Sequence, residues 1–482
     1  MLFNSLSFLI FLPIAFAVYW ILSKARQLVF QNLWLLITSY VFYGWWDYRF
    51  LALIFASTVV DYWVGIRLGN SEHKRIRKRW LWLSVAFNLG LLGFFKYYNF
   101  FVESWVEAFA SLGYQLDPWT IQIILPVGIS FYTFQTMSYS LDIYRNKIEP
   151  THDFIGFAAF VSFFPQLVAG PIERASNLLP QILRQRKFSY PKAVLGCRLI
   201  LWGFFKKIVI ADALAPSVNE IFANYGDYSS SVLLLGAFYF TLQIYCDFSG
   251  YSDIAIGTAK LFGIDLMTNF RFPYFSRSIG EFWRRWHISL STWFRDYVYI
   301  PLGGSRVSKS QTIRNVFIIF LVSGLWHGAN WTFVFWGLLH ALLFMPSFVL
   351  GTNRQSFSTW QGLPITTANL KDIIRALGLF SIIVLSWVFF RADSIQDAFA
   401  YLKGVFSMNP NGLAFANPYD NQSLSFEHFC IALLFLFELV LYMQLLTYTP
   451  RWLRWSAYLC ALAFIVTSIQ LKSSAPFIYF QF

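Results

Sequence analysis

The chain has 482 residues, of which 57% are hydrophobic and only 13% are charged, and its net charge is +13 at pH 7. Soluble globular proteins carry about 25% charged residues, so this composition excludes a soluble protein, which would lack the charges to cover its surface. The positive charge does not indicate nucleic-acid binding, because Lys and Arg lie in short connectors between apolar runs, as the positive-inside bias of membrane proteins requires. The sequence predicts an all-α, polytopic integral membrane protein.

Apolar runs of nearly spanning length recur along the chain, and a bilayer core needs roughly 20 apolar residues in a helix. The runs lie at residues 4–22, 30–47, 50–66, 80–102, 121–144, 193–213, 231–248, 315–350, 376–390, 429–448 and 453–471. The run 315–350 is long enough for two helices, and the first run lacks the basic start and cleavage site of a signal peptide. We predict about ten to twelve transmembrane helices within one membrane-embedded domain, residues 1–482.

Residues 154–170 are apolar but contain Pro165 and Gly170. Broken helices at membrane depth are tolerated only where protein buries them or where they line a cavity. The segment is therefore predicted to be a re-entrant element rather than a full span.

The connectors alternate in charge. Lys24 and Arg26 follow the first run, and six further bases lie between residues 67 and 79, which places both connectors in the cytoplasm. Residues 97–144 contain no Lys or Arg, so that connector is expected to be external. The basic segment 173–192 is again cytoplasmic, and the N-terminus is then outside.

Four cysteines lie in apolar segments without the spacing of metal ligands: Cys197, Cys246, Cys430 and Cys460. Such cysteines behave as small buried hydrophobes. Neither a metal site nor a disulfide framework is predicted.

Residues 251–314 interrupt the pattern of spans, since nine Lys or Arg and four Asp or Glu are interleaved with aromatic residues. The segment is too polar to span and is expected at the cytoplasmic face, partly embedded. Residues 281–296 predict one amphipathic helix with an apolar stripe about 120° wide. His287 lies at the edge of that stripe, where it either faces a polar tunnel or is incidental to an interfacial helix.

His327 lies in the motif Gly-Leu-Trp-His-Gly-Ala-Asn, inside the apolar run 315–350. An ionisable side chain within a membrane segment is a functional hypothesis by default, and histidine suits general-base catalysis near neutral pH. A structural pairing with a neighbouring helix is the alternative. His340 has no polar neighbours in sequence and is predicted to be structural, while Lys206 and Lys207 are expected to pair with acidic groups or to snorkel.

These residues resemble a known family. The block 281–304, EFWRRWHISLSTWFRDYVYIPLGG, and the later motif GLWHGAN are similar to the membrane-bound O-acyltransferases, and most of all to the branch of bacterial alginate O-acetyltransferase membrane subunits. The segments LPVGISFYTFQTMSYSLDIYR and FFPQLVAGPIER resemble the same branch. The resemblance extends from residue 1 to about 395, and residues 396–482 are expected to add two C-terminal spans.

The resemblance implies a helical bundle that encloses a tunnel, in which an acyl group passes from a cytoplasmic thioester to a hydroxyl acceptor outside. His327 corresponds to the essential family histidine and His287 to a second family histidine. No cofactor is expected to be tightly bound, and the acyl donor would be acetyl-coenzyme A or an acyl carrier thioester. An extracytoplasmic acetyltransferase-like partner protein would complete delivery to the polysaccharide.

The implied activity is O-acetylation of an extracytoplasmic polysaccharide, such as alginate, another exopolysaccharide or peptidoglycan, by a multi-pass protein of the bacterial inner membrane. One alternative is D-alanyl transfer to a cell-wall polymer. A second alternative, from another class, is a secondary transporter or flippase. Transporters often contain internal repeats, and no repeat is evident in this sequence.

Overall fold

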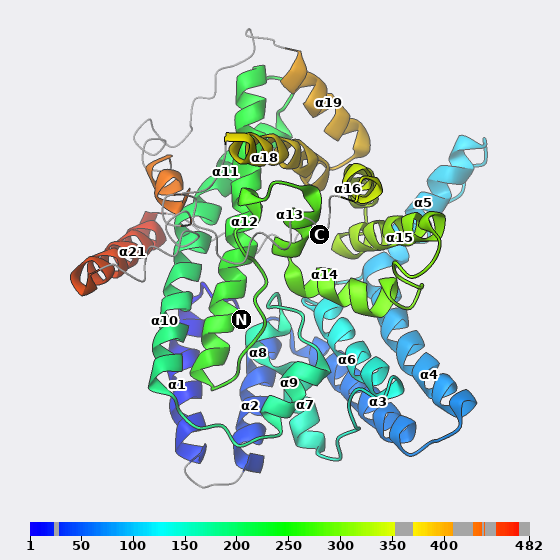
Figure 1. Cartoon of the computed structure of the whole chain (residues 1–482), viewed down its shortest axis with the longest axis vertical. Helices are drawn as coiled ribbons and strands as arrows, with labels where there is room; N and C mark the ends of the chain where they lie inside the picture. Colours follow the sequence, from blue (N-terminus) through cyan, green and yellow to red (C-terminus); the bar gives the residue numbers. More distant parts are fainter. Residues whose placement is uncertain (24–27, 352–369, 408–427, 436–437, 439–449, 472–482) are drawn as a thin grey trace. The chain divides into compact units, whose positions relative to one another are not determined.

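The structure is a computed structural model that describes residues 1–23, 28–351, 370–407, 428–435, 438 and 450–471 (Figure 1). The described part is helical and contains no β-strand, which confirms the predicted all-α class. The chain divides into two compact units. Unit 1 comprises Met1–Ile200 with Ile254–Met267, and unit 2 comprises Leu201–Asp253 with Thr268–Phe482.

Unit 1 is built from the first nine helices and most of the tenth. These are α1 (Leu6–Ser23), α2 (Leu28–Gly44), α3 (Leu51–Gly69), α4 (Lys74–Leu92), α5 (Tyr98–Ser111), α6 (Ile129–Tyr144), α7 (Phe154–Ser162), α8 (Phe164–Leu167), α9 (Ala175–Ile182) and α10 (Tyr190–Phe204). A π-helical turn, Gly93–Tyr97, joins α4 to α5. The last two turns of the long helix α12 (Ser230–Leu261) also belong to this unit.

Unit 2 starts at the end of α10 with a π-helical segment, Phe205–Ala211. Its helices are α11 (Asp212–Ala223), most of α12, α13 (Ile279–Arg285), α14 (Ile288–Phe294), α15 (Lys309–His327), α16 (Trp331–Val349), α18 (Leu370–Arg391), α19 (Ile395–Phe406) and α21 (Arg451–Leu471). The run 315–350 thus forms two helices, as predicted.

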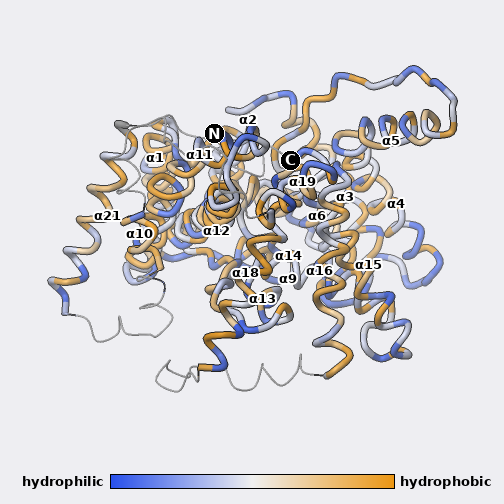
Figure 2. Tube along the Cα trace, turned by 90° about the horizontal axis from the view of Figure 1, so that it is seen from above, coloured by the Kyte–Doolittle hydropathy of each residue, from blue (hydrophilic) through white to orange (hydrophobic). Residues whose placement is uncertain are grey.

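Six helices in the described part are long and apolar enough to cross a membrane. They are Leu6–Ser23, Tyr48–Gly69, Ser230–Leu261, Trp331–Val349, Leu370–Arg391 and Arg451–Ile469. Figure 2 shows that apolar residues predominate along the helices. The protein is a multi-pass membrane protein, while the total of ten to twelve spans stays a prediction, since the predicted span 429–448 lies largely outside the described residues.

The predicted break within 154–170 is present. α7 ends at Ser162, Phe163 leaves the helical conformation with φ −50° and ψ 103°, and α8 extends only to Leu167. Every residue from Gly156 to Ile172 is buried. A broken helix that is buried in protein meets the condition under which such backbone is tolerated at membrane depth.

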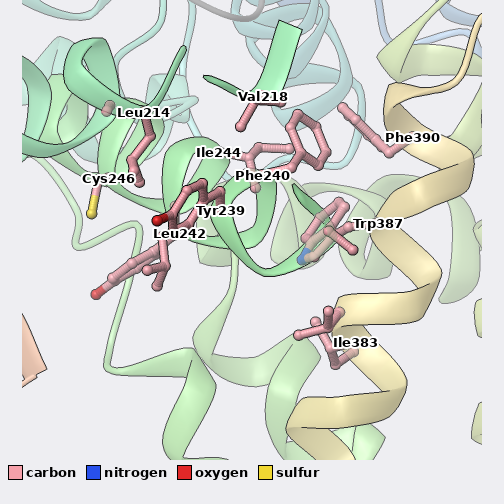
Figure 3. Packing of buried hydrophobic residues seen from close by; sticks show 14 of the residues in the cluster. Leu214, Val218, Tyr239, Phe240, Leu242, Ile244, Cys246, Ile383, Trp387 and Phe390 are labelled. Atoms are coloured by element: carbon pink, nitrogen blue, oxygen red, sulfur yellow. The ribbon is translucent and has the colours of Figure 1, made fainter. Parts of the chain in front are cut away.

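The interior of unit 2 is a large apolar cluster to which α11, α12 and α18 contribute. Figure 3 shows Trp387 and Phe390 on α18 beside the residues of α12, among them Phe240. Trp387 is 1% exposed and Phe240 is 0% exposed. Helices in a membrane associate through close van der Waals packing rather than through removal of apolar surface from water, and these aromatic side chains supply such packing.

The expectation that all four cysteines are buried is wrong for two of them. Cys246 and Cys430 are buried, whereas Cys197 and Cys460 are exposed on α10 and α21. A membrane helix can present an apolar side chain outward to lipid, so an apolar segment in the sequence does not by itself imply burial within the protein.

Candidate active site

His327 is the last residue of α15, at a sharp reversal of the chain. Gly328 is extended, and Asn330 begins α16 by accepting a hydrogen bond from the Thr332 main-chain N–H at 2.9 Å. A Cβ atom at Gly324 would collide with the main-chain oxygen of Phe333. The glycines of the motif therefore allow α15 and α16 to pack closely, as small residues do between membrane helices, and place His327 at the turn.

The imidazole of His327 lies in an aromatic enclosure and is 2% exposed. Its ring centroid is 5.1 Å from that of Trp326, 5.3 Å from that of Trp336 and 5.4 Å from that of Phe390. Such walls exclude water and lower the local dielectric, which strengthens any electrostatic interaction made inside. Charge that develops near His327 would thus interact strongly with the imidazole.

The structure brings the two predicted site histidines together, with their ring centroids 6.2 Å apart. His287 is fully buried, and its ring lies 4.6 Å from Phe248 and 5.7 Å from Trp326. Neither of its ring nitrogens has a hydrogen-bond partner among the residues that the structure describes. Burial lowers the pKa of His287 from 6.5 to about 3, so its imidazole is neutral at physiological pH.

The predicted continuous helix over 281–296 is wrong. The chain forms two short helices, α13 and α14, because Trp286 is extended and His287 adopts the left-handed conformation with φ 44° and ψ 55° (Figure 1). The apolar periodicity of 281–296 is compatible with either arrangement, since the residues on both sides of the break stay buried. The break orients the His287 side chain differently from the way a continuous helix would.

Three tryptophans complete the surroundings of the histidines, and of these only Trp286 lies in a segment that the sequence singled out. Trp336 stacks on Trp387 at 5.3 Å, and Trp286 lies 5.0 Å from Trp387. Their indole N–H groups are buried and have no hydrogen-bond partner among the described residues. Only the abundance of tryptophan pointed toward Trp336 and Trp387, because in sequence they resemble residues that face lipid.

His340 lies on α16 in the same aromatic cluster, 4.7 Å from Trp336 and 5.2 Å from Trp283. It is fully buried. Trp336 contacts both His340 and His327, with ring centroids 4.7 and 5.3 Å away. The interpretation of His340 as structural stays a prediction.

The paired lysines of the π-helical segment are buried, and the prediction that they pair is confirmed. Lys207 Nζ lies 2.8 Å from carboxylate oxygens of both Asp212 and Asp247, and Lys206 Nζ lies 2.7 Å from Asp253. Lys206 also donates a hydrogen bond to Ser249 at 2.9 Å. Buried charges persist only when paired and hydrogen-bonded, so these groups link α12 to the segment that precedes α11.

The protein is a multi-pass membrane protein in which two buried imidazoles approach one another within an aromatic enclosure. Residues 145–390 match the family model of the membrane-bound O-acyltransferases. The chain belongs to this family and is an acyltransferase.

Several proteins of known name are similar in sequence to this chain over most of its length. The chain is 45% identical to the probable alginate O-acetylase AlgI of Pseudomonas aeruginosa, over 84% of this chain and 75% of that protein. It is 39% identical to the probable alginate O-acetylase AlgI of Pseudomonas putida, over the full length of both. It is 37% identical to the peptidoglycan O-acetyltransferase of Helicobacter pylori, over 85% of this chain and 80% of that protein.

Proposed function

We propose that this protein O-acetylates an extracytoplasmic polysaccharide, and that His327 and His287 carry the transfer. The observation that supports this most is the approach of two buried histidines from separate motifs to 6.2 Å within an aromatic enclosure. The relatives named for alginate and peptidoglycan O-acetylation support the choice of an acetyl group and of a polymer acceptor.

In the proposed reaction His327 is the general base. Its imidazole takes the proton of the acceptor hydroxyl as the oxygen attacks the thioester carbonyl. The new C–O bond forms, the C–S bond breaks, and the proton returns to the departing thiolate, so that an ester and a free thiol result. A thioester is already activated, so orientation of the two reactants supplies much of the rate.

His287 has a different part in this proposal. Because burial keeps its pKa at about 3, the ring is neutral and can both donate and accept a hydrogen bond at its two nitrogens. It would hold the acceptor hydroxyl or the thioester oxygen in line with His327. This neutral ring also avoids the repulsion that a second imidazolium would impose when His327 becomes protonated.

The donor is proposed to be acetyl-coenzyme A or an acyl carrier thioester that approaches from the cytoplasm. The connectors expected at the cytoplasmic face are rich in Lys and Arg, and positive charge there raises the local concentration of anions. We further propose an extracytoplasmic acetyltransferase-like partner and a location in the bacterial inner membrane. No tightly bound cofactor is needed, because both reacting groups come from the substrates.

A deletion strain tests the proposal. The O-acetyl ester content of the surface polysaccharides is measured by mass spectrometry in cells without the chain and after its reintroduction. Acetyl ester that disappears and returns with the chain supports the proposal and identifies the polymer. Loss of D-alanyl ester instead would establish the aminoacyl alternative, and loss of the polymer itself with esters unchanged on what remains would indicate transport.

A further inference from the structure

The backbone of His287 is held in an unfavourable conformation. Its φ of 44° lies in the left-handed region, which costs a residue with a side chain about 1 to 2 kcal/mol. Such a conformation persists only when surrounding contacts fix it, and it is found most often at functional sites. The contacts that fix His287 therefore decide where its ring points.

Asn269, from the segment that follows α12, supplies these contacts. Its main-chain oxygen accepts the Ile288 N–H at 2.9 Å. Its side-chain Oδ1 accepts the Ser289 main-chain N–H at 3.3 Å and the Ser289 hydroxyl at 2.9 Å. Its Nδ2 donates to the Ser252 hydroxyl on α12 at 3.1 Å. Asn269 is fully buried, so water does not compete for these bonds.

Asn269 caps the N-terminus of α14, a role that normally belongs to the N-cap residue, here His287. The first N–H groups of a helix lack partners inside the helix, and the side chain of the N-cap residue usually accepts one of them. His287 is the N-cap of α14 and makes no such bond. Asn269 accepts hydrogen bonds from the main-chain N–H groups of Ile288 and Ser289. The imidazole of His287 therefore does not cap the helix, and both of its nitrogens can bind a substrate group.

We propose that Ser252, Asn269 and Ser289 form a clamp that positions His287 for acyl transfer, with Asn269 as its central positioning residue. The inference rests on the proposed function to the extent that His287 takes part in the reaction. Ser252 anchors the clamp on α12, the longest helix described. A second tie, from the Arg271 N–H to the Arg285 main-chain oxygen at 3.0 Å, holds the same segment against the end of α13.

Two substitutions separate the clamp from ordinary packing. Asn269→Ala removes every side-chain bond, whereas Asn269→Asp keeps the oxygen that accepts from Ser289. The matched control is Asn315→Ala, because Asn315 is equally buried and donates to the main-chain oxygens of Leu302 and Gly304 at 3.1 and 3.4 Å. All variants are produced as the full chain in membranes and compared at equal amounts of folded protein.

The first readout is the initial rate of O-acetyl ester formation on the surface polysaccharides. The second is the extent of diethyl pyrocarbonate modification of His287 and His340 in the purified protein, measured by mass spectrometry. Asn269→Ala is expected to lower the rate roughly 10- to 100-fold, as small misplacements of catalytic groups do, and to raise modification of His287 alone. Asn269→Asp is expected to restore most of the rate. Asn315→Ala is expected to change neither readout selectively.

A double-mutant cycle with His287→Ala shows whether Asn269 acts through that histidine. A clamp on His287 predicts that Asn269→Ala adds no further loss when His287 is absent. Additive losses, an unchanged rate, or equal increases in modification of His287 and His340 would overturn the proposal. If His287→Ala alone retains full transfer, the proposed role of His287 fails, while selective exposure of His287 in Asn269→Ala would still establish the clamp.

Discussion

Asp61 in unit 1 and His287 in unit 2 are both fully buried polar side chains, yet their surroundings differ. The carboxylate of Asp61 accepts hydrogen bonds from the Ser84 hydroxyl, from Asn88 Nδ2 at 2.7 Å and from the Ser140 hydroxyl at 2.9 Å. These donors lie on α4 and α6, so the carboxylate joins three helices. His287 is instead surrounded by aromatic rings, and its nitrogens have no partner among the described residues.

Burial alone thus does not mark a functional group in this membrane protein. Nearly all buried polar groups in native proteins are hydrogen-bonded, and a catalytic role is one of several reasons for an exception. Asp61 has the partners that a structural link between helices requires, as Lys207 does between its two carboxylates in unit 2. His287 makes no such bond among the described residues, and neither does His340, so what distinguishes His287 is its approach to His327 at 6.2 Å between ring centroids.

Substitution of Asp61 should have the largest effect on stability. Asp61→Ala removes the hydrogen bonds from Ser84, Asn88 and Ser140, and each such bond contributes about 1 kcal/mol net, so a loss of about 3 kcal/mol is expected. Thermal unfolding in detergent measures this loss. The rate of ester formation per folded molecule should stay unchanged. A loss of acyl transfer at normal stability would show that Asp61 is not merely a structural link between helices.

Substitution of His287 should have the opposite profile. His287→Phe keeps an aromatic ring in the aromatic enclosure but removes both nitrogens, so the rate of O-acetyl transfer should fall by roughly 10²-fold. The unfolding temperature should be equal or higher, since the substitution removes two buried nitrogens that have no hydrogen-bond partner among the described residues. Full transfer by this variant would show that the absence of partners at His287 is unrelated to catalysis.

Asp265 offers the smallest expected effect. Lys192 and Lys260 lie 2.5 and 2.7 Å from its carboxylate, which is 45% exposed. Burial raises the pKa of Asp265, but the hydrogen bonds from the two lysines outweigh burial and hold the pKa below its usual value. An exposed pair of this kind contributes at most about 1 kcal/mol.

The lowered pKa of Asp265 determines how its contribution to stability depends on pH. Because the pKa of Asp265 is lowered in the folded state, its stabilisation is present above the ordinary pKa of about 4 and is lost as the pH falls through the lowered value. Asp265→Asn should therefore lower the unfolding temperature slightly at neutral pH, and less so at high salt. A large decrease in the unfolding temperature that salt does not reduce would show that Asp265 behaves like the buried Asp61 instead.

The sequence was sufficient to predict the all-α membrane class and the two helices within 315–350, because hydropathy is a local signal. The role of His327 stays a prediction, although the structure places this histidine near His287. The sequence did not predict the break at His287. The periodicity of 281–296 fits a continuous helix equally well, and the break depends on bonds from Asn269, which lies outside that segment. The enclosure by Trp336 and Phe390 was equally hidden, since apolar residues that face lipid or a site look alike in sequence.

The central claim is that His327 performs acyl transfer and does not merely fill the aromatic cluster. The most direct test compares His327→Ala with His340→Ala, because both histidines are buried and contact the same Trp336 ring. The O-acetyl ester content of the surface polysaccharides is measured in cells at matched amounts of inserted protein. Loss of ester by at least about 100-fold in His327→Ala, with ester retained in His340→Ala, is the predicted result. Equal ester content in the two variants would contradict the account.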